Sequence, residues 1–506
     1  MSVIKKNIVA NFGGGAWTGI MNLVFVPLYI HFLGIEAYGL VGIFGTLLAI
    51  FALLDMGLST TLNREMARLA AYEGRAQEMR DLVRTLEVPY WLVALFLGVI
   101  VSALAPFIAY HWVNVESLSP KTVQIAIMLM GLAVAFQWPI SLYSGGLLGL
   151  QRQVLLNVIN VVTATFRGLG AVLILWLASP TAEAYFLWQI VASVIQIGLI
   201  AFFLWRSLPE FSEPPRFRRE ILSSIWRFAA SMTGIVAAST ILTQLDKVIL
   251  SRILSLETFG YYTLASVVAM SLYRFISPVF TATFPRFTHL VGTGATEELI
   301  RLYHKSAQLL SVLVLPVAVV VSLFSKEILL LWTQSPVTTE HTYVLVSILV
   351  IGTAIHGLIH IPYALQLAFG WTRLPLTINI VSVLFVVPLV ILLTRWFGPV
   401  GAASVWLILN IAYVVSSITL MHRRLLPAEK WRWCFEDVGR PLVAAFVVGV
   451  TGRCIIRSDW PSLPLIASLA LVSVTALLAT ACAANQLDVL ARGKSFMTEL
   501  RMRAMR

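Results

Sequence analysis

The chain has 506 residues, of which 59% are hydrophobic and 12% are charged, whereas soluble domains contain about 45–50% apolar and about 25% charged residues. This composition excludes a string of soluble domains, which would need far more charge to cover its surface, and it predicts an all-α integral membrane protein. The net charge of +12 comes from short basic runs between apolar stretches, so membrane topology explains it and no nucleic-acid partner is expected.

About fourteen segments are long and apolar enough to cross a bilayer as helices, which takes about 20 residues each. Six of them precede the polar stretch 207–220, at about 8–31, 37–60, 87–110, 122–146, 154–178 and 182–205. Six more follow at about 222–250, 258–285, 305–325, 341–369, 374–396 and 399–421, and a final pair at 438–456 and 462–483. The first is interpreted as a retained helix rather than a signal peptide, because no small-residue cleavage site closes it.

The basic residues predict the orientation. If the N-terminus is cytoplasmic, most of the 36 lysines and arginines fall in cytoplasmic segments, so the positive-inside rule places both termini in the cytoplasm. The connector 61–86 alternates charged and apolar residues. It is interpreted either as an amphipathic helix on the inner leaflet, in contact with membrane lipids, or as a solvated helical connector.

A short motif indicates an internal duplication. The run LGIEAYG at 33–39, between the first and second helices, is matched by LSLETFG at 254–260, between the seventh and eighth. Asn160 and Asn379 also recur at corresponding places in helices five and eleven. With six helices in each repeat, both repeats begin on the same side of the membrane and form two parallel lobes.

The expected domains are therefore an N-lobe over 1–221, a C-lobe over 222–436, and two extra helices with a basic tail over 437–506. Parallel repeats are related by an axis along the membrane normal, which favours a substrate site between the lobes. Rocking of one lobe against the other would then give alternating access.

Two arginines fall inside predicted helices, Arg167 near the centre of the fifth and Arg274 near the centre of the eighth. A basic residue at mid-bilayer costs about 2.5–3.5 kcal/mol on insertion scales, so it requires a partner, water or a function. In a cavity, the guanidinium fork suits an anionic ligand such as a phosphate. Alternatively, each arginine bonds neighbouring carbonyls or a carboxylate and locks helices together.

Two aspartates are candidates for ion coupling or for a motif role. Asp246 lies near the outer end of the seventh helix and could bind a proton or sodium ion, accept a hydrogen bond from an arginine of the eighth helix, or anchor the interface. It is not expected to pair with Lys247, because helical neighbours point about 100° apart. Asp55, near the cytoplasmic end of the second helix, is assigned a structural role with Arg64 or the nearby connector.

His356 and His360 are one helical turn apart and therefore share a face of the tenth helix. They could relay protons, although interhelical hydrogen bonding is favoured. Without carboxylate or thiol neighbours they would make a poor metal site, and the three scattered cysteines predict neither a disulfide framework nor a zinc site. No metal or cofactor is expected.

Missing motifs argue against an enzyme. The sequence contains no GxxxxGK[ST] motif for a nucleotide phosphate. It also has no DxD pair and no large outer loop, which disfavours a glycosyltransferase or ligase that gathers carboxylates or a metal in one place.

Several runs together resemble bacterial polysaccharide flippases, the oligosaccharide-lipid translocases of the multidrug/oligosaccharidyl-lipid/polysaccharide exporter superfamily. They are Asn11, Pro27 and Tyr29, LGIEAYG at 33–39, LDMGL at 54–58, NRE at 63–65, QLDKVI at 244–249, ETFGYY at 257–262 and FGPVGAA at 397–403. Fourteen helices fit this branch better than the twelve of its drug-exporter branch.

The resemblance implies a V-shaped carrier that moves polyprenyl-pyrophosphate-linked oligosaccharide from the inner to the outer leaflet of the bacterial cytoplasmic membrane. It implies Arg274 as a cation of the central cavity and Asp246 as a motif residue. Protons or sodium are the candidate coupling ions, and glycan-assembly enzymes the candidate partners. The alternatives are a drug or cation antiporter of the same fold and, from another class, a membrane enzyme of glycan assembly. The first helix lacks the interior acidic residue that such antiporters often carry.

Overall fold

The computed structural model describes residues 3–72, 74–210, 213–223, 240, 243–457 and 460–484. The chain divides into two compact units, residues 1–263 and 264–506. The described residues form an all-helical fold, as the composition predicted. The division between the units lies inside the helix Leu256–Met270, beyond the lobe boundary at 221/222 that the duplication predicts. The division of the chain into an N-lobe, a C-lobe and two extra helices stays a prediction.

Unit 1 is built from long helices joined by short turns, and it includes one 3-10 turn and one π-helical turn. Its elements are α1 (Val3–Leu33), α2 (Ile35–Phe51), η1 (Ala52–Asp55), α3 (Leu58–Leu69), α4 (Ala76–Phe107), η2 (Ile108–Trp112), α5 (Pro120–Gln137), α6 (Ile140–Gly149), α7 (Gln153–Leu177), α8 (Ala182–Ser207) and the first half of α10 (Leu256–Met270).

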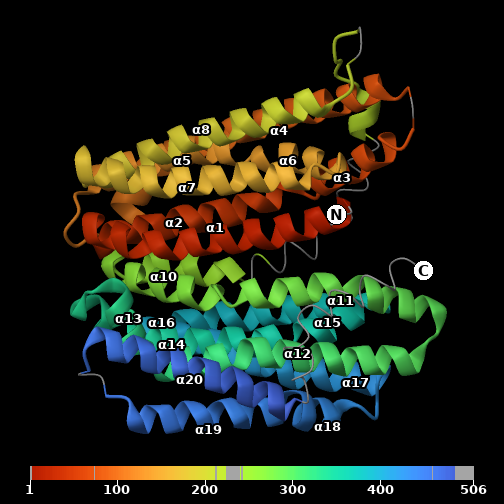
Figure 1. Ribbon diagram of the computed structural model, residues 1–506. Helices are drawn as coiled ribbons and strands as arrows, with labels where there is room; N and C mark the ends of the chain where they lie inside the picture. The colour runs from red at the N-terminus through yellow and green to blue at the C-terminus, as the bar shows by residue number, and fades with distance from the viewer. Residues whose placement is uncertain are drawn as a thin grey trace. The chain divides into compact units, whose positions relative to one another are not determined.

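Unit 2 contains the rest of α10 and a second set of helices. These are α11 (Tyr273–Thr293), α12 (Thr296–Leu323), α13 (Ser325–Thr333), α14 (Pro336–Leu358), α15 (His360–Ala368), α16 (Arg373–Tyr413), η3 (Val414–Ile418), α17 (Thr419–Leu425), α18 (Lys430–Arg432), η4 (Trp433–Gly439), α19 (Arg440–Ile455) and α20 (Ser462–Ala483). Helices α19 and α20 pack on each other and on α12 (Figure 1).

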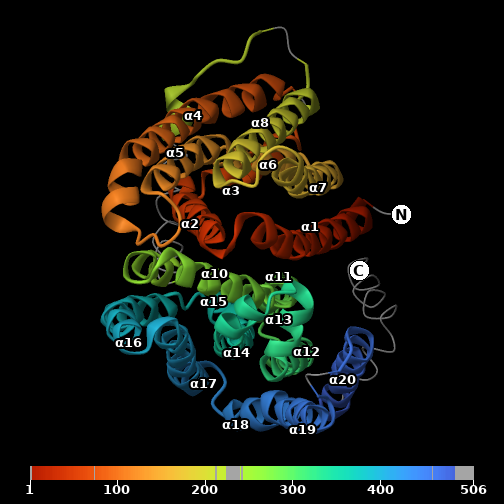
Figure 2. The same cartoon turned by 90° about the vertical axis from the view of Figure 1, so that its left-hand side faces the viewer.

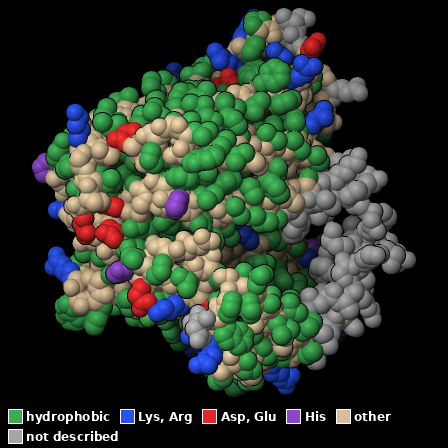
Figure 3. Space-filling view, turned by 60° about the vertical axis from the view of Figure 1, so that its left-hand side comes forward, with side chains coloured by type: hydrophobic (Ala, Val, Ile, Leu, Met, Phe, Trp, Pro, Cys, Tyr) green, Lys and Arg blue, Asp and Glu red, His purple; other side chains and the backbone are tan. Residues whose placement is uncertain are grey.

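The helices of unit 1 pack lengthwise, with α4 on α5, α5 on α8 and α1 on α7 (Figures 1 and 2). Leu62, Leu86 and Leu142 are fully buried between them, while Leu92 and Phe96 on the opposite side of α4 are more than 60% exposed. Figure 3 shows a broad apolar surface with the charged side chains mostly near its margins. Such a surface is stable in lipid rather than in water.

Twelve helices of the described residues are long and apolar enough to cross a membrane. One of them, Arg373–Leu425, has 53 residues and is interrupted at Gly398 (φ 59°, ψ −143°), where the sequence predicted the junction between two spans. A continuous helix of that length would measure more than twice the roughly 30 Å of a hydrocarbon core. The break at Gly398 is therefore consistent with two membrane crossings in this segment. Most of the expected span 222–250 lies outside the described residues. The total of fourteen stays a prediction.

Three expected spans are each divided into two helices. The fourth consists of α5 and α6, which meet at Trp138 and Pro139. The eighth consists of α10 and α11, and the tenth of α14 and α15. A proline such as Pro139 has no backbone N–H and displaces the preceding helical turn, so it favours a break at its position.

The connector 61–86 is not one separate helix but is divided between α3 and α4. Its first half belongs to α3, which packs on α6 and buries the side chains of Leu62 and Met66 completely. Its second half is the first part of α4, which begins at Ala76 and extends the third expected span by several turns. The apolar side of α3 therefore packs against helices of unit 1, and contact of the connector with the inner leaflet stays a prediction.

Both copies of the duplicated motif meet in unit 1. A Cβ atom added at Gly39 would lie 2.5 Å from the backbone oxygen of Leu256, and one added at Gly260 would collide with the backbone oxygen of Ile35. Each glycine therefore lets the start of one helix cross closely over the start of its repeat counterpart. The packing explains why glycine stands at the same place in both motifs.

The glutamate of the first motif binds a loop at the same end of unit 1. Glu36 is 5% exposed, and its carboxylate accepts hydrogen bonds from the backbone N–H groups of Glu116 (2.7 Å), Ser117 (2.9 Å) and Leu118 (3.1 Å). The hydroxyl of Ser117 donates a fourth. The carboxylate thereby fixes the loop between η2 and α5 against the start of α2.

The opposite end of unit 1 carries the basic segments. The N-terminal end of α1, helix α3 and the chain after α8 are all at that end (Figure 1). The arginines of these segments include Arg64, Arg68, Arg75, Arg80, Arg84, Arg216 and Arg218. Their gathering at one end is what the positive-inside interpretation requires of a single side of the membrane.

Candidate functional site

Arg167 lies in the middle of α7 and is held by helix α8. Its Nη1 donates to Oε1 of Gln189 at 3.1 Å and its Nη2 to Oε1 of Gln196 at 2.8 Å, while the indole of Trp188 donates to its backbone oxygen. Both side-chain partners are neutral amides. The guanidinium is thus oriented, yet these contacts leave its positive charge uncompensated.

Asp55 sits where η1 ends in unit 1 and is surrounded by hydroxyl groups. Its carboxylate accepts from Ser59 at 2.8 Å and from Ser141 at 3.2 Å, and also from the hydroxyl of Tyr90. Arg64, one of the partners suggested by the sequence, forms an ion pair with Glu65 at 2.7 Å. The contacts of Asp55 join α3, α4 and α6 and fit the structural role expected for it.

Asp246 lies in the helical segment 243–253 of unit 1. Its Oδ2 accepts from the hydroxyl of Tyr262 at 2.9 Å, whereas its Oδ1 is buried and has no hydrogen-bond partner among the residues that the structure describes. Lys247 donates to Gln244 at 3.3 Å rather than to its acidic neighbour, as helical geometry predicted. Asp246 therefore combines one satisfied and one unsatisfied carboxylate oxygen, which is unusual for a buried group.

Unit 2 brings three of the predicted residues to one region. Tyr273 and Arg274 form the first turn of α11, and the hydroxyl of Tyr273 lies 2.5 Å from Nδ1 of His356 on α14. His360, at the start of α15, has its ring centroid 5.0 Å from that of His356, and its Nδ1 lies 3.0 Å from the backbone oxygen of His356. The side chain of Arg274 is exposed in this unit.

The two histidines stand among aromatic rings instead of metal ligands. Trp406 and Tyr413 from α16 pack against His356, and Phe280 from α11 packs against His360. Within the described part of the chain, no three histidine, cysteine or acidic side chains gather in a way that could hold a metal ion. The contact between Tyr273 and His356 is the interhelical hydrogen bond favoured from the sequence.

Unit 1 also has a pocket of about 550 Å³ at its basic end. Its lining residues are Arg80, Arg84, Glu87, Trp91, Tyr143, Trp205 and Pro215. Glu87 accepts from the indole of Trp205 at 2.8 Å and from Arg84 at 3.2 Å, so its charge is matched inside the pocket. The sequence did not indicate this site, because its basic residues were assigned to a connector at the membrane surface.

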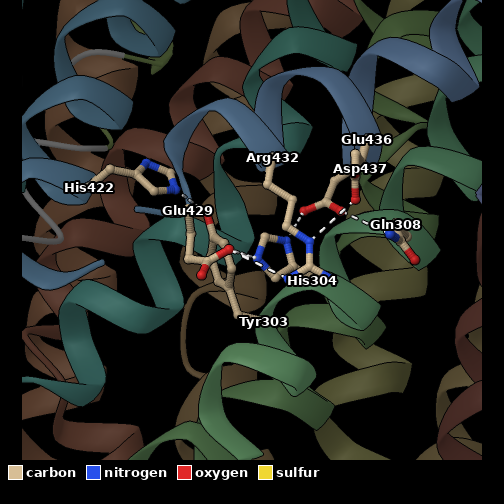
Figure 4. A network of polar contacts seen from close by, with 8 residues as sticks. All are labelled: Tyr303, His304, Gln308, His422, Glu429, Arg432, Glu436 and Asp437. Atoms are coloured by element: carbon tan, nitrogen blue, oxygen red, sulfur yellow. Dashed lines mark hydrogen bonds and ion pairs between the residues drawn. The ribbon is translucent and has the colours of Figure 1, made fainter. Parts of the chain in front are cut away.

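A buried polar network in unit 2 was likewise not anticipated. His304, on α12, places Nδ1 2.5 Å from Oδ2 of Asp437 and Nε2 2.8 Å from Oε2 of Glu429 (Figure 4). Gln308 donates to the other oxygen of Asp437 at 2.9 Å. Little in the sequence indicates this network, because His304 and Asp437 are 133 residues apart and each adjoins a predicted helix end, where polar residues are ordinary.

Residues 4–291 match the profile of the family described as "Polysaccharide biosynthesis protein", and residues 232–392 match the profile of the family described as MatE. A protein of Shigella flexneri with the name "Putative O-antigen transporter" is 22% identical over 410 residues, covering 80% of this chain and 94% of that protein.

Solved structures show the same fold. The lipid II flippase MurJ in an inward closed conformation superposes with a TM-score of 0.72 at 13% identity, covering 96% of this chain and all of that one. An inward-facing multidrug resistance MATE transporter of the MOP superfamily superposes with a TM-score of 0.66 at 16% identity, covering 82% of this chain and 96% of that one.

Proposed function

Because the chain belongs to the polysaccharide biosynthesis protein family within the MOP superfamily of membrane transporters, we propose that it flips a polyprenyl-pyrophosphate-linked oligosaccharide from the inner to the outer leaflet of the bacterial cytoplasmic membrane. Both termini are assigned to the cytoplasm on the strength of the basic residues gathered at one end of unit 1. The proposed movement is alternating access between two lobes, without chemical change of the substrate.

The charge of Arg167 is the observation that carries this choice of substrate. A guanidinium in the middle of a membrane helix, with two neutral amide partners, favours a ligand that is anionic. Pyrophosphate offers the oxygens that a guanidinium binds in pairs. Arg274, exposed in unit 2, is proposed as a second contact for the pyrophosphate.

Asp246 is proposed as the site of ion coupling. Its buried Oδ1 accepts no hydrogen bond from the described part of the chain, so a proton or a sodium ion bound there would supply a partner. His356 and His360 remain a second candidate for handling protons. Coupling at Asp246 predicts that Asp246→Asn, which keeps the bond to Tyr262, flips substrate at a rate that no longer responds to an ion gradient. Asp55→Asn is the matched control, because hydroxyl groups already surround that carboxylate.

The substrate assignment can be tested with purified protein in proteoliposomes that contain a polyprenyl-pyrophosphate oligosaccharide. The leaflet in which the glycan is exposed would be followed with and without proton and sodium gradients. Several glycans are needed, since an unsuitable sugar would mimic an inactive protein. Protein-dependent flipping is the expected result, and an absence of flipping with every glycan would refute the assignment.

Variants of Arg167 and Arg274 test, in the same flipping assay, whether these side chains bind the pyrophosphate. Loss of one charge-assisted contact, worth about 1.5–3 kcal/mol, should lower the flipping rate of Arg167→Gln and of Arg274→Gln by about tenfold to a hundredfold. Arg152→Gln, at the exposed start of α7, and Arg286→Gln, later in α11, are the matched controls. Full activity in Arg167→Gln would remove the charge argument.

The second candidate function is a drug or cation antiporter, which the MatE match over residues 232–392 favours. It predicts gradient-driven efflux of a cationic dye from the same proteoliposomes and no flipping of the glycan lipid. A membrane enzyme of glycan assembly would instead form product on an acceptor lipid. Contacts with glycan-assembly enzymes are proposed for the cytoplasmic segments and would appear as co-purification of those enzymes.

A further inference from the structure

The network around His304 contains more hydrogen bonds than its ordinary protons can supply. The two ring nitrogens lie 2.5 Å and 2.8 Å from carboxylate oxygens of Asp437 and Glu429, as Figure 4 shows. A neutral imidazole carries only one N–H, and an ionised carboxylate only accepts. Two hydrogen bonds therefore need a second proton, either on the other ring nitrogen or on one of the carboxyl groups.

The burial of His304 and Asp437 supports the need for a second proton. Asp437 is fully buried and His304 is 3% exposed, and one oxygen of Asp437 is already used by Gln308. Without the second proton, the neutral imidazole of His304 could donate its single N–H to Asp437 or to Glu429, but not to both. One of the two carboxylates would then lack its hydrogen bond to the ring. Burying a charge without such compensation costs several kcal/mol. The closed arrangement is thus favoured when the three side chains hold one more proton than they would in water near neutral pH.

The neighbouring charged groups do not remove this requirement. Those that face the network are Tyr303 from α12, His422 from α17, Lys430 and Arg432 from α18, and Cys434 and Glu436 from η4. Arg432 lies 3.6 Å from Glu429 and 3.3 Å from Glu436, so its charge is shared between one carboxylate of the network and one outside it, and it supplies no hydrogen bond between His304 and either carboxylate. Helix α20, which also packs on α12, carries no acidic or basic side chain.

The positions of His304, Glu429 and Asp437 in the chain show which segments the proton-dependent hydrogen bonds connect. His304 belongs to α12, Glu429 precedes α18, and Asp437 lies in the π-helical turn η4 that leads into α19. The segment 426–439 is therefore attached to α12 at two points through one imidazole ring. Immediately after it begins the helix pair α19–α20, whose members both pack along α12.

We propose that His304, Glu429 and Asp437 form a buried proton-binding site, the His304 clasp, which holds segment 426–439 and the start of the α19–α20 pair on α12 while the proton is bound. When the proton leaves, the two carboxylates repel each other and segment 426–439 opens to water. The clasp is separate from the residues proposed for substrate binding and ion coupling, and it operates whatever substrate the protein carries.

Linkage gives the sign and size of the effect. In the opened, hydrated segment the histidine is neutral above about pH 6.5 and both carboxyl groups are ionised. The closed form then holds one proton more than the open form, so the opening equilibrium should rise with pH by up to tenfold per unit. A contact without a bound proton would open to the same extent at every pH in this range.

Hydrogen exchange measured by mass spectrometry on the full-length protein in lipid nanodiscs tests this directly. The amides of segment 426–439 would be followed between pH 6.5 and 8.5, with the rates corrected for intrinsic chemical exchange. In the parent protein we expect a corrected rate that rises toward tenfold per pH unit. A corrected rate that does not change with pH would overturn the proposal.

One substitution separates proton binding from simple packing. In Asp437→Asn, the amide oxygen can still accept from Gln308 while its N–H donates to Nδ1 of His304, and a neutral imidazole then satisfies both bonds. This variant should stay closed and lose the pH dependence, and Glu429→Gln should do so by the same logic if the first variant does not fold. Retention of the parent slope in the folded variants would refute the clasp.

His422→Gln is the matched control. His422 is also fully buried in this network, but its ring contacts the hydroxyl of Tyr303 and the backbone oxygen of Ile418 instead of a carboxylate. Its variant should keep the parent pH dependence. Equal loss of the slope in His422→Gln would assign the effect to any disturbance of the cluster and would overturn the role given to the proton.

Discussion

Replacing Glu36 by glutamine should release the loop between η2 and α5. The carboxylate accepts hydrogen bonds from three backbone N–H groups, of Glu116, Ser117 and Leu118, and from the hydroxyl of Ser117. Glutamine offers one acceptor oxygen in place of two, and its NH₂ group would face a donor. An orphaned donor costs about 1–3 kcal/mol, and each of the three remaining bonds loses about 1 kcal/mol with the charge, which gives roughly 4–6 kcal/mol.

At 1.36 kcal/mol per factor of ten, the opening equilibrium of this loop should rise by about a thousandfold or more. Hydrogen exchange of the amides at 116–118 measures the change. Glu116→Gln is the matched control, because it makes the same chemical change on an exposed side chain of the same loop and should leave exchange unaltered. Exchange in Glu36→Gln within about threefold of the control would refute the view that the carboxylate holds the loop.

Three further outcomes test the packing and the charges of the described residues. Gly39→Ala should cost about 1–3 kcal/mol through overpacking and lower the melting temperature, because its Cβ would lie 2.5 Å from the Leu256 oxygen. The control Gly45→Ala, with no atom within 4 Å of its Cβ, should be neutral or stabilising. Equal melting temperatures of the two variants would contradict the close crossing at Gly39. Tyr90→Phe should cost about 1.5–3 kcal/mol by removing a donor to the Asp55 carboxylate, whereas a denaturation midpoint equal to that of the parent would deny this bond a stabilising role. The carboxylate of Glu340, 2.7 Å away, raises the pKa of Lys326 above its usual 10.5, so the stability that this ion pair contributes is present below that pH and lost only above it. The difference in melting temperature between the parent and Lys326→Gln should therefore be constant between pH 6 and 9. A difference that varies across this range would contradict the expectation.

The membrane-spanning helices could be predicted because lipid imposes a simple requirement. A segment that crosses the bilayer must satisfy its backbone hydrogen bonds internally and present apolar side chains, and both conditions are visible in a window of about 20 residues. The break at Gly398 was visible as well, since glycine followed by Pro399 favours an interruption. The start of α4 was placed too late because charged residues near Ala76 hid a helix that is buried on one side.

The polar contacts could not be predicted in the same way. Arg167 was recognised as a costly residue, but its glutamine partners on α8 depend on how two helices rotate against each other, which hydropathy does not encode. The clasp joins residues separated by 125 and 133 positions. Asp246 was recognised through its motif, while the unsatisfied state of its Oδ1 depends on tertiary packing alone.

The reciprocal crossing of Gly39 and Gly260 also bears on the order in which the chain is made. Residues 33–39 emerge from the ribosome long before their counterparts at 254–260, so the start of α2 must wait at the membrane with its contact surface uncovered until more than two hundred further residues have been synthesised. Synthesis that stops near residue 221 would leave this surface open. A nascent chain extended through residue 263 has all the segments that close unit 1, and resistance to protease at the η2–α5 loop should first arise at that length.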